Sequence, residues 1–226
     1  MQAYLTFLQK AIPELWDGTL ITLQITFVTL IIGFVIGFPA AFARIYGGKV
    51  LKSISIVYTE IFRGTPVLVQ LFLIYYGLPQ FGITLSAFTA AYIALGLNSG
   101  AYQAEYFRGA IQAISSGQMM AAQSLGMNKL KAIIYIIIPQ AFRLALPSWA
   151  NEVVSMVKVT SIVYLTAVPD LMTKAKMLSS RYFNPIETYL TAAVFYLVII
   201  GILTLILNYI EKVSRIPGLE MEGEAR

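Results

Sequence analysis

Charged side chains occur inside or next to long apolar stretches of the 226-residue chain at six positions: Glu60, Arg63, Glu105, Arg143, Glu152 and Lys158. The chain has no histidine and no cysteine. This excludes Ser-His-Asp and Cys-His nucleophilic sites, HExxH zinc sites and histidine-ligated haem or copper. Only carboxylate or lysine chemistry remains, and no paired-aspartate motif is present, so we expect no catalytic residue, no metal and no cofactor. A charge at the centre of a bilayer costs about 2.5–3.5 kcal/mol. These residues therefore predict a polar pathway or ligand site, and the alternatives are internal ion pairs or side chains close enough to an interface to reach water.

Two apolar stretches carry polar side chains along one helical face. At about 100° per residue, Asn98, Tyr102 and Glu105 fall on one line of a helix. Glu152 and Lys158 belong to a second, broader polar arc. Two such stripes, each with a carboxylate, could line one cavity for a ligand that carries an ammonium group and a carboxylate. An internal Glu152–Lys158 pair is the alternative, and it requires a break in the helix because the two residues are six positions apart.

Small residues recur at helical spacing in the same apolar stretches. Gly33 and Gly37 form one GxxxG motif, and Gly96 and Gly100, opposite the first polar stripe, form another. Such pairs let helix backbones approach closely in membranes. We expect tight packing within the chain, and a contact between subunits is the alternative for Gly33 and Gly37.

The composition indicates a polytopic membrane protein. Hydrophobic residues make up 58% of the chain and charged residues 12%, with a mean hydropathy of +0.74. A soluble domain usually carries about 25% charged residues. The net charge of +5 reflects basic residues kept on cytoplasmic loops, so nucleic acid is not an expected partner and the lipid bilayer is.

Five crossings are predicted from apolar stretches of about 20 residues or more. The uncharged run between Arg63 and Glu105 is too long for one crossing, and the turn-forming residues at 77–82 divide it. The region 130–168 is interrupted by prolines and charges, so we expect one crossing made of broken helical pieces. The predicted crossings are 19–43, 53–78, 84–113, 130–168 and 188–210.

The distribution of Lys and Arg predicts an N-terminus outside and a C-terminus in the cytoplasm. We expect an interfacial segment at 1–18 with Trp16 as an anchor, a membrane domain at 19–215 and a cytoplasmic tail at 216–226. The inner side would hold Arg44, Lys49, Lys52, Arg108, Lys129, Lys131, Lys212, Arg215 and Arg226, against Lys10, Lys174, Lys176 and Arg181 outside.

The cytoplasmic loop at 114–131 predicts a short surface helix at about 116–127. Ser115 or Ser116 can cap its start, and Gly126 can end it. A short, capped and partly apolar helix between two crossings is suited to the groove of a cytosolic partner.

This loop resembles the Glu-Ala-Ala motif of membrane subunits of ATP-binding cassette (ABC) importers. Met120-Ala121-Ala122, Gly126, Ile136 and Ile138-Pro139 have the spacing of the motif, with Met120 in place of Glu and Ile138 in place of Leu. The chain further resembles permeases of the polar amino acid uptake family in several stretches: Glu60-Ile61-Phe62-Arg63-Gly64-Thr65-Pro66, Ala101-Tyr102-Gln103-Ala104-Glu105 through Arg108-Gly109, Gly117-Gln118, Ser124-Leu125-Gly126-Met127, Ile138-Pro139-Gln140-Ala141, and Lys158-Val159-Thr160-Ser161, where Val159 replaces Asp.

The resemblance implies an all-α membrane protein with the fold of a type I ABC importer permease. It also implies a cytosolic ATP-binding subunit, an extracytoplasmic solute-binding protein and a second permease subunit, for which we expect a homodimer. Replacement of Glu by Met120 affects one polar or ionic docking contact and not the coupling helix itself. The expected ATPase-coupling residues are Met120, Ala121, Ala122, Gly126 and Pro139. The expected substrate-binding residues, near mid-membrane, are Asn98, Tyr102, Glu105, Glu152, Ser155, Lys158 and Ser161.

The prediction is therefore a permease subunit, in the bacterial cytoplasmic (inner) membrane, of an ATP-driven importer for a polar amino acid. Its several carboxylates favour a basic substrate such as arginine or histidine, with glutamine or another polar amino acid as the alternative. The chain has no GxxxxGK[ST] motif, so ATP hydrolysis is expected in a partner chain. Two other classes are a self-contained secondary transporter or channel, for which no internal repeat is evident, and an intramembrane enzyme.

Overall fold

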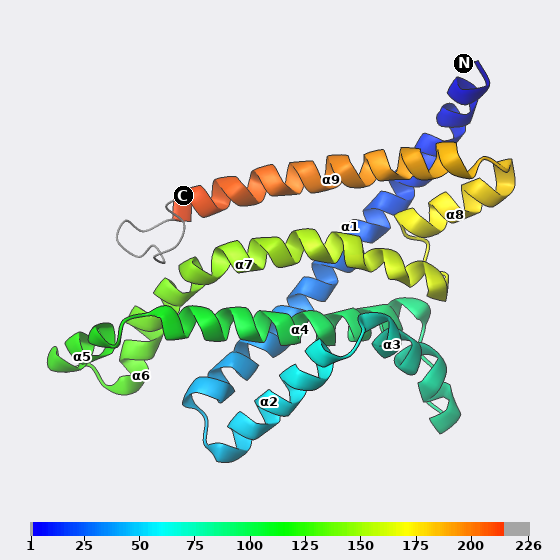
Figure 1. Cartoon of the computed structure of the whole chain (residues 1–226). Coiled ribbons are helices and arrows are strands. Elements are labelled where there is room, and N and C mark those ends of the chain that lie inside the picture. Colours follow the sequence, from blue (N-terminus) through cyan, green and yellow to red (C-terminus); the bar gives the residue numbers. More distant parts are fainter. Residues whose placement is uncertain (1, 215–226) are drawn as a thin grey trace.

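The computed structural model describes residues 2–214, with side chains from residue 7 onward, and the secondary structure in this part is all helical. The predicted tail at 216–226 lies outside the described residues. In Figure 1, α4, α7 and α9 run side by side, and α1 crosses them obliquely. The elements are α1 (Gln2–Tyr46), α2 (Lys49–Gly64), α3 (Val67–Phe72), the π turn η1 (Leu73–Gly77), the 3-10 turn η2 (Leu78–Phe81), α4 (Ala87–Ala113), α5 (Ser116–Ser124), α6 (Lys129–Ala132), the π turn η3 (Ile133–Ile137), α7 (Ile138–Val159), the 3-10 turn η4 (Thr160–Thr166), α8 (Leu171–Tyr182) and α9 (Pro185–Ser214).

Three helical stretches of the described residues are long and apolar enough to cross a membrane: Phe7–Tyr46, Lys129–Thr166 and Pro185–Ser214. A fourth results if α2 and Val67–Phe81 count as one span, although they meet at an angle of 101°. α4 is not among them, because polar side chains such as Asn98 and Gln103 lower its hydropathy. The all-α, multi-pass prediction is confirmed, whereas the number of five crossings and their orientation stay predictions.

Within the predicted second crossing, 53–78, the helix is interrupted. α2 ends at Gly64, and Thr65 and Pro66 adopt extended backbone before α3 begins. Pro66 cannot donate a helical hydrogen bond, and the residue before a proline avoids the α region. The predicted division near 77–82 is confirmed, because the chain turns at η2 and Gly82 has φ +78°.

The fourth predicted crossing is one long helical stretch rather than a set of broken pieces. Pro147 lies inside α7 without ending it. Pro139 stands in the first turn of α7, directly after the π turn η3. Because Pro139 has no N–H, it leaves the carbonyl of Tyr135 without its helical donor, and the local π geometry accommodates this.

Glycine motifs join α1 to α4. A Cβ atom added at Gly37 would lie 2.5 Å from the carbonyl oxygen of Gly100 and 3.0 Å from the amide nitrogen of Ala104. One added at Gly33 would lie 3.1 Å from the Gly100 nitrogen, and one at Gly96 would lie 2.5 Å from Ile32. The two GxxxG motifs therefore pack against each other, which confirms the prediction of tight packing within the chain.

The N-terminal segment is continuous with the first long helix. α1 passes through residue 18 without a break, so the predicted segment 1–18 is not a separate helix. Phe7, Ala11 and Leu15 are buried against α8 and α9. The other faces of α9 remain apolar and exposed, for example at Leu197 and Leu205, as expected for a helix in contact with lipid.

A buried carboxylate caps α8 in the segment between two candidate spans. Oδ1 of Asp170 accepts hydrogen bonds from the Thr173 amide (2.9 Å) and hydroxyl (2.7 Å), whereas Oδ2 has no partner among the described residues. Asp170 is fully buried, and this burial raises the pKa of its carboxyl, although the bonds from Thr173 act in the other direction.

Asp170→Asn is therefore expected to stabilise the protein at pH 7 by about 1–3 kcal/mol, because asparagine also caps helices and removes the buried charge. The folded state raises this pKa above its ordinary value near 3.9, so stability of the unmodified protein falls as pH increases from that value through the folded-state pKa. Melting temperatures of both proteins from pH 4 to pH 8 should converge at the acid end. A variant that melts lower than the original protein at every pH would contradict this assignment.

Candidate functional site

The loop between α4 and α7 contains a short helix that is capped at both ends. Oγ of Ser115 accepts a hydrogen bond from the Gly117 amide (3.3 Å) at the start of α5. At the other end, Gly126 has φ +81° and donates its amide hydrogen to the carbonyl of Gln123 (2.9 Å), while the Met127 amide donates to the carbonyl of Ala122 (3.1 Å). This pair of bonds closes a helix at glycine. The helix, its serine cap and its glycine end are as predicted, and its coupling role stays a prediction.

Most of the predicted coupling residues are accessible. Met120 is 60% exposed, and Ala121, Gly126 and Pro139 are also exposed. Ala122 is buried, at 4% exposure, on the side of α5 that faces the rest of the protein. Figure 1 places α5 at the end of the bundle where α1 turns into α2 and where α9 ends. The exposed face of α5 is thus free to contact another protein.

A cavity of about 650 Å³ lies where α2, α3, α4 and α7 meet. Its wall carries two charged groups, the guanidinium of Arg63 and the carboxylate of Glu152. Of the predicted substrate residues, Asn98, Tyr102, Glu152 and Ser155 line it, whereas Glu105, Lys158 and Ser161 do not. The remaining lining residues are Gly64, Thr65, Pro66, Val67, Tyr106, Asn151, Met156 and Val159.

The cavity owes its shape to the bend between α2 and α3. The side-chain Nε2 of Gln70 lies within hydrogen-bond distance of the Phe62 carbonyl (2.9 Å) and of the Thr65 carbonyl (3.1 Å) and hydroxyl (2.8 Å). The side-chain Nδ2 of Asn98 also donates to the Phe62 carbonyl (2.8 Å). These bonds satisfy carbonyl oxygens that lose their helical partners where α2 ends. Asn98 therefore both lines the cavity and fixes its wall.

Glu152 is buried, at 5% exposure, and belongs to a hydrogen-bonded network. Ser99 donates to its Oε1 (2.8 Å), and Tyr106 donates to its Oε2 (3.2 Å). Gln103 extends the network by donating to Ser99 (3.1 Å) and accepting from Trp149 (3.1 Å). The predicted helical stripe that begins at Asn98 does not include Ser99, Gln103 and Tyr106, the members of this network on α4. The same calculation begun at Ser99 aligns Gln103 and Tyr106 with it.

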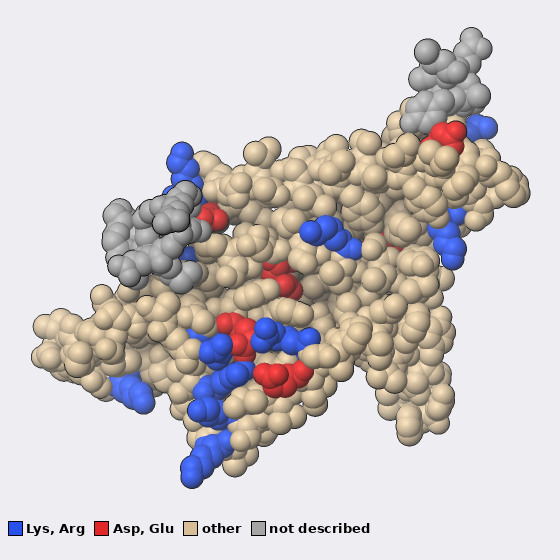
Figure 2. All heavy atoms as spheres, viewed as in Figure 1, with Lys and Arg blue, Asp and Glu red and all other residues tan. Residues whose placement is uncertain are grey.

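Glu105 lies in a cluster of arginines rather than on the cavity wall. Its Oε1 accepts a hydrogen bond from Arg44 of α1, which also donates to Thr59 of α2 (3.0 Å). Its Oε2 accepts from Nε (2.9 Å) and Nη2 (2.6 Å) of Arg108, and Nη1 of Arg63 is 3.7 Å away. Figure 2 shows acidic and basic side chains meeting on the visible face over α2 and the neighbouring part of α4. The internal ion-pair alternative therefore applies to Glu105.

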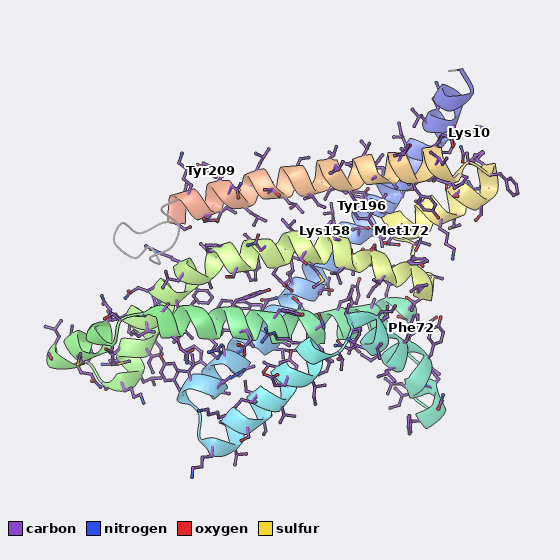
Figure 3. All side chains as sticks on the ribbon, in the orientation of Figure 1. Lys10, Phe72, Lys158, Met172, Tyr196 and Tyr209 are labelled. Atoms are coloured by element: carbon purple, nitrogen blue, oxygen red, sulfur yellow. The ribbon has the colours of Figure 1, made fainter. Side chains whose placement is uncertain are left out.

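Lys158 and Ser161 lie at the end of α7 and in η4. Lys158 is exposed, and Figure 3 labels it on α7. None of the ion pairs among the described residues joins Lys158 to Glu152. The two residues are six positions apart on the unbroken helix α7, so their side chains lie on different faces of it. Ser161 donates its hydroxyl hydrogen to the Lys158 carbonyl (2.7 Å), a local bond within the turn.

Comparison with known proteins identifies the family. Residues 33–215 match the family model described as binding-protein-dependent transport system inner membrane component. The chain is 38% identical to the probable amino-acid ABC transporter permease protein YckA of Bacillus subtilis (strain 168), over 90% of each chain. It is 37% identical to the glutamine transport system permease protein GlnP of Escherichia coli (strain K12), over 91% of this chain and 95% of GlnP.

Solved structures agree with this result. A crystal structure of an amino acid ABC transporter with histidines superposes with a TM-score of 0.86 at 39% identity, covering 91% of this chain and 96% of that one. The MetNI methionine ABC transporter in an inward-facing conformation shares the fold, with a TM-score of 0.77 at 18% identity over 90% of this chain and 97% of that one. The chain belongs to the family of binding-protein-dependent transport system inner membrane components and is an amino-acid ABC transporter permease of the inner membrane.

Proposed function

We propose that this permease carries a polar amino acid through the cavity between α2, α4 and α7 by alternating access. It crosses the membrane five times with its N-terminus outside, pairs with a second copy and receives its substrate from an extracytoplasmic solute-binding protein. The exposed face of α5 docks on a cytosolic ATP-binding subunit, whose closure drives the change between outward and inward access.

The observation that carries the proposal is the pair of opposite charges on the cavity wall. An amino acid is a zwitterion, and Arg63 can bind its carboxylate while Glu152 binds its ammonium group. The amide of Asn151 and the hydroxyl of Ser155 on the same wall can contact a polar side chain. The volume of about 650 Å³ is within the range of small-molecule sites.

The charge balance favours a substrate with an uncharged polar side chain, such as glutamine. Glu105 is not available to a basic substrate, because it forms ion pairs with three arginines. The two wall charges then match the two charges of the zwitterion. A basic amino acid such as arginine or histidine is the second candidate, favoured if Glu152 binds a cationic side chain instead of the ammonium group.

The test is ligand-stimulated ATP hydrolysis by the reconstituted complex across a panel of amino acids, with glutamine expected to stimulate most. Stimulation by arginine or histidine alone would support the second candidate. The absence of stimulation by any amino acid would contradict the proposed function.

Glu152→Gln is expected to weaken binding of glutamine and arginine alike, by about tenfold or more, because both lose the charge partner of the ammonium group. Direct binding to the purified complex measures this effect. Lys158→Gln is a matched control at an exposed position off the cavity wall, and it should change neither affinity. If only the affinity for arginine falls, Glu152 binds the cationic side chain of the substrate. If neither affinity changes, the role of Glu152 is purely structural.

A further inference from the structure

Arg63 belongs to two neighbouring sites at once. Its guanidinium lies 5.4 Å from the centre of the Tyr102 ring, and both residues line the cavity. The same guanidinium is 3.7 Å from Oε2 of Glu105. This distance is longer than a hydrogen bond, and the Arg63 side chain is 39% exposed. Arg63 is therefore attracted to Glu105 without being locked to it.

The other two arginines hold Glu105 more closely. Arg44 binds one carboxylate oxygen, and Arg108 binds the other through two nitrogens. Three guanidinium groups thus share one carboxylate. A second carboxylate, Glu60, lies one turn before Arg63 on α2. It does not pair with these arginines in any of the ion pairs found in the described part of the chain. Uncompensated positive charge among membrane helices is costly, so the cluster has an affinity for one further anion.

We propose that Arg63 is a carboxylate sensor: it leaves Glu105 to bind the carboxylate of the transported amino acid, and this exchange loosens α2 from α4. The inference rests on the proposed function, because it assumes that an amino acid occupies the cavity. Arg63 lies next to Gly64, where α2 ends and the wall of the cavity bends. The exchange replaces a contact between two helices with a contact to the ligand, so occupancy of the cavity alters the packing of the helices around it.

The experiment measures how much the carboxylate of the ligand contributes to its affinity for each protein variant. The complete complex in lipid nanodiscs, without the solute-binding protein, is titrated with L-glutamine and its decarboxylated analogue 4-aminobutanamide, and with L-arginine and agmatine. The original protein should prefer the carboxylate-bearing member of a pair by about 10- to 100-fold. Arg63→Gln should reduce this preference to near unity, and Arg63→Lys should restore part of it.

Arg143→Gln is the matched control, because Arg143 is an exposed arginine of α7 that does not line the cavity and contacts Glu105 in none of the ion pairs of the described residues, and it should keep the preference. Glu105→Gln should free Arg63, so that it tightens ligand binding and raises ATP hydrolysis without ligand. If Arg63→Gln elutes as a folded complex and keeps the preference, or if Glu105→Gln weakens binding while folded, the sensor is refuted. If the original protein binds none of the four ligands, the proposed function fails instead, for these substrates.

Discussion

Gly37→Val is expected to separate α1 from α4 and to leave little folded permease. A Cβ atom at this position meets the carbonyl oxygen of Gly100 at 2.5 Å and the amide nitrogen of Ala104 at 3.0 Å. Both are backbone atoms of a helix, so no side chain can move aside, and the two helices must part. Overpacking of this kind costs about 3 kcal/mol, and in this protein it also removes the close approach on which the α1–α4 interface depends.

The measurement is the fraction of permease that elutes as a monodisperse complex after detergent extraction, together with its melting temperature. Gly201→Val is the matched control, because a Cβ atom at Gly201 on α9 has nothing within 4 Å. The control should behave as the original protein. Equal yields and melting temperatures for the two variants would show that the glycine contact is dispensable.

The second large effect is expected at the coupling helix. Ala121→Trp adds a large ring to the exposed face of α5 without crowding the buried side, where Ala122 lies. If this face enters a cleft on the ATP-binding subunit, the ring prevents docking. Uptake should then fall by about tenfold or more, while amino acid binding to the permease itself remains.

Uptake into proteoliposomes and ligand stimulation of ATP hydrolysis measure this loss. Leu197→Trp places the same ring at a residue of α9 that is 70% exposed, and it should leave both activities unchanged. Normal coupling in Ala121→Trp would mean that α5 docks through another face or not at all.

The features that the sequence predicts correctly depend on local chemistry. The ends of α5 follow from a serine and a glycine with well-defined capping roles, and close packing within the chain follows from glycines at helical spacing, although the pairing of α1 with α4 does not. The turn near 77–82 follows from residues that break helices. Each of these signals acts within a few residues, so one chain is enough to interpret it.

The errors come from partners that are distant in the sequence. The bend at Pro66 lies inside an uncharged run, which hydropathy treats as uniform. Glu105 appeared available because Arg44, 61 positions away, approaches it only in the folded protein. Prolines and charges suggested breaks in the region 130–168, but α7 continues through Pro147 as one helix, so Lys158 lies on a different face from Glu152.

We propose that this chain forms a substrate pathway that is driven by a separate ATP-binding subunit. The most direct test of this coupling is accumulation of labelled glutamine in proteoliposomes that contain either the complete complex or the permease alone, each with and without ATP. Accumulation against a gradient is expected only with the complete complex and ATP. Accumulation by the permease alone would contradict the account.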